Sequence, residues 1–141
     1  MIEVINRQRK RKLHDEQWRD FSERVLRAID SADHDATIVF ISDAAIRKLN
    51  RQFRGKNYVT DVLSFPARAE RFEKEARGNL GEVIISVERA AAQAKDNALT
   101  FTNEVQQLIL HGLLHLAGYD HETDKGEMNR LELKLRRRLG I

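Results

Sequence analysis

The chain has 141 residues, a formal net charge of +3, 41% hydrophobic and 33% charged residues, and no cysteine. This length suits one domain with a single hydrophobic core, so one domain is expected over residues 1–141. The lack of cysteine excludes disulfides and thiolate metal sites and favours a cytoplasmic location. No apolar run approaches the roughly 20 residues of a membrane span, so no membrane partner is expected.

Hydrophobic periodicity in the first third of the chain predicts two strands, each followed by a helix. Residues 1–6 form a short strand pattern, and Asp15 is expected to cap the first helix. Its apolar stripe comprises Trp18, Phe21, Val25, Leu26 and Ile29. The β-branched run at 37–41 is typical of a buried strand, after which Ser42 is expected to cap a second helix. That helix carries Ile46, Leu49 and Phe53.

The rest of the chain adds two strands and three helices. The strands are expected at 62–65, stopped by Pro66, and at 81–87, with a charged loop at 67–79 between them. The helices are expected at 88–97, 102–117 and 124–139. Helix 102–117 is apolar on most sides, which indicates burial. The last helix carries a stripe of Met128, Leu131, Leu135 and Leu139. The pattern predicts an α+β fold with a mixed sheet of about four strands, five or so helices, and a central buried helix.

Three of the five histidines fall within residues 111–121, in the spacing H-x3-H-x5-H. Residues four apart on a helix share one face, so His111 and His115 can reach one metal ion. Gly118 suits the left-handed turn that ends a helix, which would bring His121 to the same ion. Three imidazoles with one open position are typical of a catalytic zinc site, although they also suit nickel or copper.

This spacing also matches the metzincin signature H-E-x-x-H-x-x-G-x-x-H except at one position. Gly112 stands where those peptidases carry the glutamate that acts as general base. The metal-binding pattern is kept and the peptidase base is lost, which argues against a peptidase.

Positive charge is concentrated near the two ends of the chain. One cluster comprises Arg7, Arg9, Lys10, Arg11 and Lys12. The other comprises Lys134, Arg136, Arg137 and Arg138. Such clusters attract phosphate backbones without reading base sequence, but they are also common as solvated edges. We expect the first cluster to hold RNA beside the metal cleft, with the second as the alternative path.

Two further segments accompany the histidine motif. The first combines Leu-Asn-Arg-Gln-Phe-Arg at 49–54 with Thr-Asp-Val-Leu-Ser-Phe-Pro at 60–66, and the second is Leu-Gly-Glu-Val-Ile-Ile-Ser at 80–86. Together with residues 111–121, these segments resemble three blocks of the YbeY family, the bacterial zinc endoribonucleases of ribosomal RNA maturation. A chance histidine motif would not bring the other two blocks with it.

The resemblance implies a single-strand-specific endoribonuclease that matures the 3′ end of small-subunit ribosomal RNA and acts in ribosome biogenesis and quality control. It implies one Zn²⁺ per chain on His111, His115 and His121, and a functional arginine at Arg54. The implied partners are single-stranded regions of ribosomal RNA precursors, the small ribosomal subunit and its assembly factors.

The chemistry of such a site needs a nucleophile and a group that stabilises charge. Zinc lowers the pKa of a bound water toward about 7, and this zinc-bound water is the expected nucleophile. A guanidinium can stabilise the charged transition state, which is the role expected of Arg54. No general base is obvious. Asp120 and Asp61 are candidates to orient a histidine ligand or to act as base, as are Glu122 and Asp124.

Two other functional classes stay open at this point. The missing base and the single metal also suit a ribosome-assembly factor whose zinc is structural, because many nucleases use two metals. The third class is a degenerate metzincin-like hydrolase.

Overall fold

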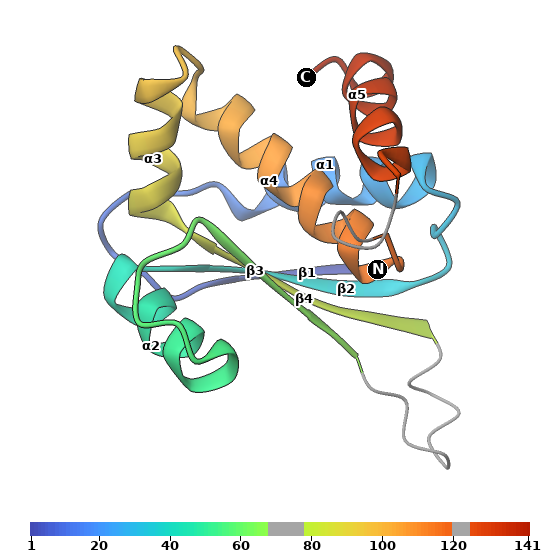
Figure 1. The fold of residues 1–141 in the computed structure, drawn as a ribbon. Helices are drawn as coiled ribbons and strands as arrows, with labels where there is room; N and C mark the ends of the chain where they lie inside the picture. The colour runs from blue at the N-terminus through green and yellow to red at the C-terminus, as the bar shows by residue number, and fades with distance from the viewer. Residues whose placement is uncertain (68–77, 120–124) are drawn as a thin grey trace.

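The computed structural model describes residues 1–67, 78–119 and 125–141, which form a four-stranded sheet with helices on both faces (Figure 1). The elements in chain order are β1 (Ile2–Asn6), α1 (Asp15–Ala28), β2 (Asp35–Ile41), α2 (Asp43–Arg54), β3 (Val62–Pro66), β4 (Asn79–Ser86), α3 (Val87–Asp96), α4 (Phe101–Leu116) and α5 (Glu127–Leu139). None of these helices is long and apolar enough to cross a bilayer.

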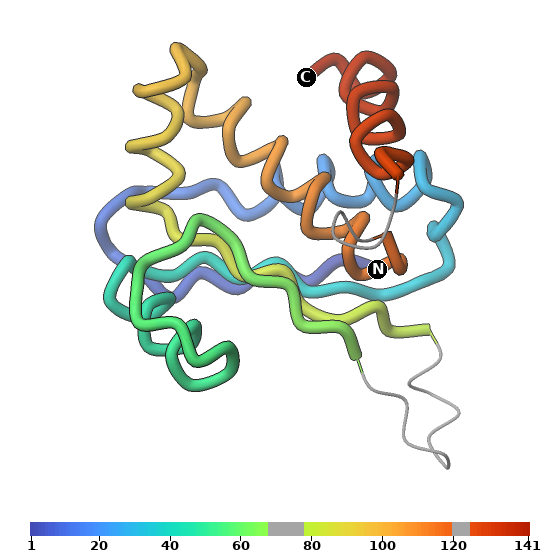
Figure 2. Tube along the Cα trace, in the orientation of Figure 1, coloured from blue at the N-terminus to red at the C-terminus, as the bar shows by residue number. Residues whose placement is uncertain are grey.

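The sheet is mixed, with strand order β1-β2-β4-β3. β1, β2 and β4 are parallel, whereas β3 pairs antiparallel with β4 and forms one edge of the sheet. The expected α+β fold with a mixed sheet is therefore confirmed. The path of the chain places α2 alone on one face, while α1, α3, α4 and α5 lie on the other (Figures 1 and 2).

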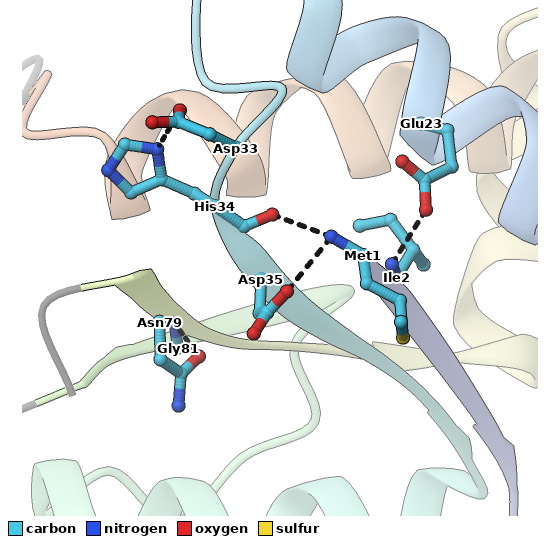
Figure 3. Close-up of polar contacts among 8 residues, drawn as sticks. All are labelled: Met1, Ile2, Glu23, Asp33, His34, Asp35, Asn79 and Gly81. Atoms are coloured by element: carbon cyan, nitrogen blue, oxygen red, sulfur yellow. Dashed lines mark hydrogen bonds and ion pairs between the residues drawn. The ribbon is translucent and has the colours of Figure 1, made fainter. Parts of the chain in front are cut away.

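Polar contacts hold the start of β1 against its neighbours (Figure 3). The amino group of Met1 donates to the backbone oxygen of His34 at 2.8 Å and to Asp35 Oδ1 at 2.9 Å. The backbone nitrogen of Ile2 donates to Glu23 Oε1 on α1 at 2.8 Å. Because β1 is the other edge strand, these bonds satisfy donors that have no further strand to pair with.

Two hydrophobic clusters occupy the two faces of the sheet. The larger one lies under α1, α4 and α5 and includes Trp18, Phe40, Val83, Ile109 and Leu113. The smaller one lies under α2 and comprises Val39, Ile41, Ile46, Leu63 and Ile84. Side chains alternate between the faces of a strand, so Ser64 faces α4 while its neighbours Leu63 and Phe65 face α2.

The observed elements differ from the expected ones mainly at their ends. The Ser42 cap is confirmed, because its side chain accepts from the backbone nitrogen of Ala45 at 3.2 Å. The expectation that Asp15 caps α1 is wrong, because His14 occupies the N-cap position. Asp15 is the first helical residue, where its carboxylate interacts favourably with the positive end of the helix dipole. Of the three apolar residues expected on the second helix, Ile46 is buried and Leu49 half-buried, whereas Phe53 is 60% exposed.

The central helix α4 is buried as expected. Its most buried side chains are Val105, Ile109, Leu110, Leu113 and Leu114, each with no exposed area. Gly112 faces β3 and β4, where α4 packs closely against the sheet. A Cβ there would lie 2.5 Å and 2.9 Å from the two γ-carbons of Val83 and 3.3 Å from Ser64 Oγ. The glycine therefore lets α4 approach β3 and β4 closely enough to fix the position of the neighbouring histidine.

Replacing Gly112 by alanine is expected to destabilise the fold, because the added methyl group overpacks Val83. Overpacking costs about 1–3 kcal/mol, while the better helix propensity of alanine returns roughly 1 kcal/mol. We expect a net loss of about 1 kcal/mol in the free energy of unfolding, measured by urea denaturation.

Gly78→Ala is the matched control, since nothing lies within 4 Å of a Cβ at that position. A double-mutant cycle with Val83→Ala should show favourable coupling, because the smaller side chain makes room for the methyl group. A Gly112→Ala variant that is more stable than the native chain would contradict the close packing.

Candidate metal centre

Two of the three predicted ligands lie together on the last two turns of α4. The Nε2 atoms of His111 and His115 are 3.0 Å apart, and their rings cross at 78° with centroids 4.6 Å apart. Both side chains are half-buried. The arrangement follows from the spacing of four residues, which places both side chains on one helical face.

The second ring nitrogen of His111 is held by a carboxylate from another helix. His111 Nδ1 lies 3.1 Å from Glu132 Oε1 and 3.4 Å from Oε2. Glu132 is only 5% exposed, and Arg136 Nη2 lies 3.6 Å from its Oε1. The carboxylate favours the tautomer with the proton on Nδ1, which leaves the Nε2 lone pair directed at His115 and available to a metal.

This pair fits a zinc ion in donor type and spacing. Two nitrogens bound to one tetrahedral zinc at about 2.0–2.1 Å are roughly 3.3 Å apart, so the two rings would separate by only a few tenths of an ångström. The third predicted ligand, His121, lies outside the described residues, as does Asp120. Within the described ranges, no three potential metal-binding side chains of His, Cys, Asp or Glu gather in one group. Gly118 has the positive φ, 103°, expected for the turn before that segment.

Arg54 lies at the edge of the sheet and is connected to α4 through one residue. Its Nη2 donates to the backbone oxygen of Ser64 at 3.2 Å, and Ser64 Oγ donates to the backbone oxygen of Gly112 at 3.4 Å. Arg54 reaches this edge from the end of α2, where Gly55 stops the helix with a φ of 66°. Ser64 thus joins the predicted arginine to the helix that carries the histidines.

Asp61 takes part in a different cluster. Its Oδ1 accepts from the backbone nitrogen of Val62 at 2.8 Å. With its amide nitrogen facing the two carboxylates, Gln93 donates to Glu104 Oε1 at 3.0 Å and to Asp61 Oδ2 at 3.1 Å. Glu104 is seven residues before His111, which is about 10 Å along the helix axis. Among the described residues, Asp61 therefore contacts Gln93 and Val62, and neither His111 nor His115 is among its hydrogen-bond partners.

The Arg7–Lys12 cluster is not brought to the histidines, which corrects the expectation that it lies beside the metal cleft. The guanidinium of Arg11 sits 3.9 Å above the ring of Phe101, at the first residue of α4, whereas His111 and His115 lie near its last. Arg7 lines a groove of about 680 Å³ on the α2 face of the sheet. The reason is topological: β1 ends at the opposite end of α4 from the histidines, so the residues that follow it start there.

Sequence reasoning missed Glu132, Ser64 and Glu104. A signal existed for Glu132, because it lies four residues after Met128 and three before Leu135, within the apolar stripe of α5. A carboxylate at a core-facing position needs a partner, and His111 is that partner here. Ser64 gave no such signal, since its role depends on how close α4 comes to β3.

The fold and the site together define a class: an α+β protein with a histidine pair on a buried helix, a carboxylate behind it and an arginine at the adjacent sheet edge. Comparison with known proteins identifies the class further. The family described as Endoribonuclease YbeY matches residues 3–140, and the chain belongs to that family.

Individual relatives agree with this assignment. A protein of Solibacter usitatus named Endoribonuclease YbeY is 43% identical over 122 residues, covering 86% of this chain and 76% of that protein. One of Geobacter metallireducens with the same name is 35% identical over 136 residues, covering 96% and 91%. A solution structure from Thermotoga maritima is 30% identical, with a TM-score of 0.68, covering 99% of this chain and 89% of that one.

Removing the carboxylate behind His111 is expected to weaken metal binding. Glu132→Ala should lower zinc affinity by about 10–100-fold, the usual effect of losing a partner that orients a histidine ligand. Competition with a chromophoric chelator measures this directly. Glu132→Gln keeps an acceptor for Nδ1 and should lose less.

Glu16→Ala, which removes an exposed carboxylate in the first turn of α1, is the control. Circular dichroism of each variant separates metal loss from unfolding. Equal zinc affinity in a folded Glu132→Ala variant would show that the contact has no role in metal binding.

A second expectation concerns Glu104. Burial raises the pKa of its carboxyl from 4.5, and the Asp61 carboxylate adds to the rise. A carboxyl with a raised pKa binds its proton more tightly in the folded state. Its stabilising contribution is therefore full below the unfolded pKa and is lost as pH rises through the folded value.

Glu104→Gln should accordingly gain stability relative to the native chain as pH rises from acid to neutral, measured by urea denaturation across that range. Glu16→Gln, which changes an exposed carboxylate on α1, is the control. A stability difference between Glu104→Gln and the native chain that stays constant with pH would show that the burial of Glu104 has no such effect.

Proposed function

We propose that this chain is a zinc-dependent endoribonuclease that cleaves single-stranded ribosomal RNA precursors, in maturation of the 3′ end of small-subunit RNA. Membership of the Endoribonuclease YbeY family supports a metal-dependent nuclease acting on RNA. Zinc as the metal, the three-histidine ligand set, and contact with the small ribosomal subunit and its assembly factors belong to the proposal. So does action in the cytoplasm.

The observation that carries the proposal is the junction at Ser64. Its backbone oxygen accepts from Arg54 and its hydroxyl donates to Gly112, the residue beside His111. Ser64 links the guanidinium of Arg54 to the backbone of α4 beside His111, which supports a phosphate-binding cation close to a metal-binding histidine pair. Phosphodiester hydrolysis needs this combination, because both the attack and the developing charge occur at one phosphorus.

Glu132 and Arg54 have different roles in the proposed reaction. When bound, zinc would supply Lewis acidity and lower the pKa of a water molecule. Glu132 holds the proton on His111 Nδ1, so the lone pair of Nε2 stays directed at the metal position. The Arg54 guanidinium, anchored by one donor, has further N–H groups for the phosphate oxygens.

The packing of α4 disfavours the metzincin-like alternative. The position of the peptidase base is Gly112, where even a Cβ would lie 2.5 Å from Val83. A glutamate there would have to displace the sheet. Gln93 ties Asp61 to Glu104, whose backbone lies about 10 Å along α4 from that of His111, so these two carboxylates contact each other through Gln93.

The proposal is tested by cleavage of ribosomal RNA precursors with purified zinc-loaded protein. Arg54→Ala is expected to fold and keep its zinc but to lower kcat by on the order of 10²-fold, the usual loss for one donor to a transition state. Arg54→Lys should recover little, because a single ammonium lacks the planar fork of donors. Arg19→Ala removes an exposed arginine from α1 and serves as the control.

His115→Ala should abolish both zinc binding and cleavage. A variant that loses zinc yet cleaves normally would show that the metal is not catalytic. Full activity of Arg54→Ala would remove the arginine from the mechanism. A wild-type protein that binds precursor RNA and zinc without cleaving it would favour the assembly factor with structural zinc.

A further inference from the structure

An exposed aromatic ring stands next to Arg54 with no role in the site described so far. Phe53 is the residue before Arg54 and the one aromatic residue of α2, and it is 60% exposed. It contacts Phe65 of the edge strand edge-to-face, with centroids 5.4 Å apart and planes at 70°. Phe65 supports one side of the ring and leaves much of the rest to solvent.

The position of this ring is fixed by the end of α2. Gly55 stops the helix, and the buried side chain of Asn50 donates to the backbone oxygen of Tyr58 at 3.0 Å, which holds the following turn in place. Leu49, one turn earlier, packs partly buried against the small cluster on this face of the sheet. An exposed ring held this firmly loses little freedom when a ligand stacks on it.

The surroundings of the ring are positively charged. The segment 43–56 contains five basic residues against one acidic residue, Asp43. The basic residues are Arg47, Lys48, Arg51, Arg54 and Lys56, all exposed. Within the described part of the chain, none of them forms an ion pair with a carboxylate. The Asp43 carboxylate is itself used, since it accepts from Ser86 Oγ at 2.6 Å.

A separate groove lies on the same face of the sheet, lined by residues of β1, β2, β4 and α2, and neither Phe53 nor Arg54 is among its lining residues. Its floor includes Val39 and Ile84, and its rim carries Arg7, Lys48 and Glu82. Apolar surface with a mostly cationic rim suits nucleotides better than an acidic or a purely apolar ligand, because bases need flat apolar contact while phosphates need cations.

We propose that Phe53 is a stacking platform for one unpaired base of the RNA, next to the phosphate held by Arg54, with the strand continuing along the basic surface of α2. This rests on the proposed function and adds to it a reason for single-strand specificity. A base inside a duplex is stacked between its neighbours and cannot lie on the ring. Aromatic stacking accepts every base, so the site is selective for strandedness rather than for sequence.

The test measures binding rather than cleavage. The probe is a single-stranded 2′-O-methyl RNA of about 12 nucleotides that carries 2-aminopurine, whose fluorescence falls on stacking. It is titrated with the zinc-loaded full chain, and a gel confirms that the probe stays intact. A duplex of the same sequence is the comparison ligand and should bind more weakly.

Phe53→Ala should weaken single-strand binding by about tenfold and abolish the fluorescence change, while the slope of log K against log salt stays the same because no charge is removed. Phe53→Trp should bind at least as well as the native chain. Phe53→Leu keeps an apolar contact with Phe65 but has no π-face, so it should behave like Phe53→Ala. Leu133→Ala, which changes an exposed apolar residue on α5, is the matched control.

Native-like binding and fluorescence in Phe53→Ala would overturn the platform. So would native-like behaviour of Phe53→Leu, because the contact would then be apolar packing without stacking. Binding of an extended peptide but not RNA would assign this edge to a protein partner instead. If the native chain binds RNA through Phe53 but does not cleave it, the platform stands and the proposed function fails. If it cleaves RNA while Phe53→Ala binds normally, only the platform fails.

Discussion

The close contact of one helix with one sheet determines most of what this molecule can do. α4 is buried along its length, and at Gly112 it approaches Val83 and Ser64 so closely that no side chain fits between them. Burial of each large aliphatic side chain contributes about 1.5–3 kcal/mol. The helix is therefore held rigidly, and His111 and His115, on either side of Gly112 in the sequence, have fixed positions relative to β3.

The side of α4 that faces away from the sheet makes a polar contact with α5. Glu132 enters the interface between α4 and α5 at a position that an apolar residue would normally occupy, and it faces His111. A buried carboxylate is costly unless it is paired, and His111 and Arg136 are the partners of Glu132 here. Packing of α5 against α4 therefore also orients the ring of His111, a predicted metal ligand.

The edge strand β3 contacts helices on both faces of the sheet. The hydroxyl of Ser64 donates to α4, and its backbone oxygen accepts a hydrogen bond from Arg54 at the end of α2. On the opposite face, the ring of Phe65 packs edge-to-face against Phe53. An internal strand would have its backbone oxygens paired on both sides. Only an edge can accept an arginine from outside the sheet and remain open to an extended nucleic-acid strand.

The sequence alone determined the α+β class, the order of elements, the burial of the central helix and the pairing of His111 with His115, because these follow from short-range periodicity. It also indicated Arg54 through a motif, but not its anchor. The tertiary structure decided what depends on distance across the fold: Glu132 behind His111, Ser64 between Arg54 and Gly112, and the exposure of Phe53. It also separated the Arg7–Lys12 cluster from the histidines, since residues that look equally available in sequence lie at opposite ends of α4 once β1 has paired with β2.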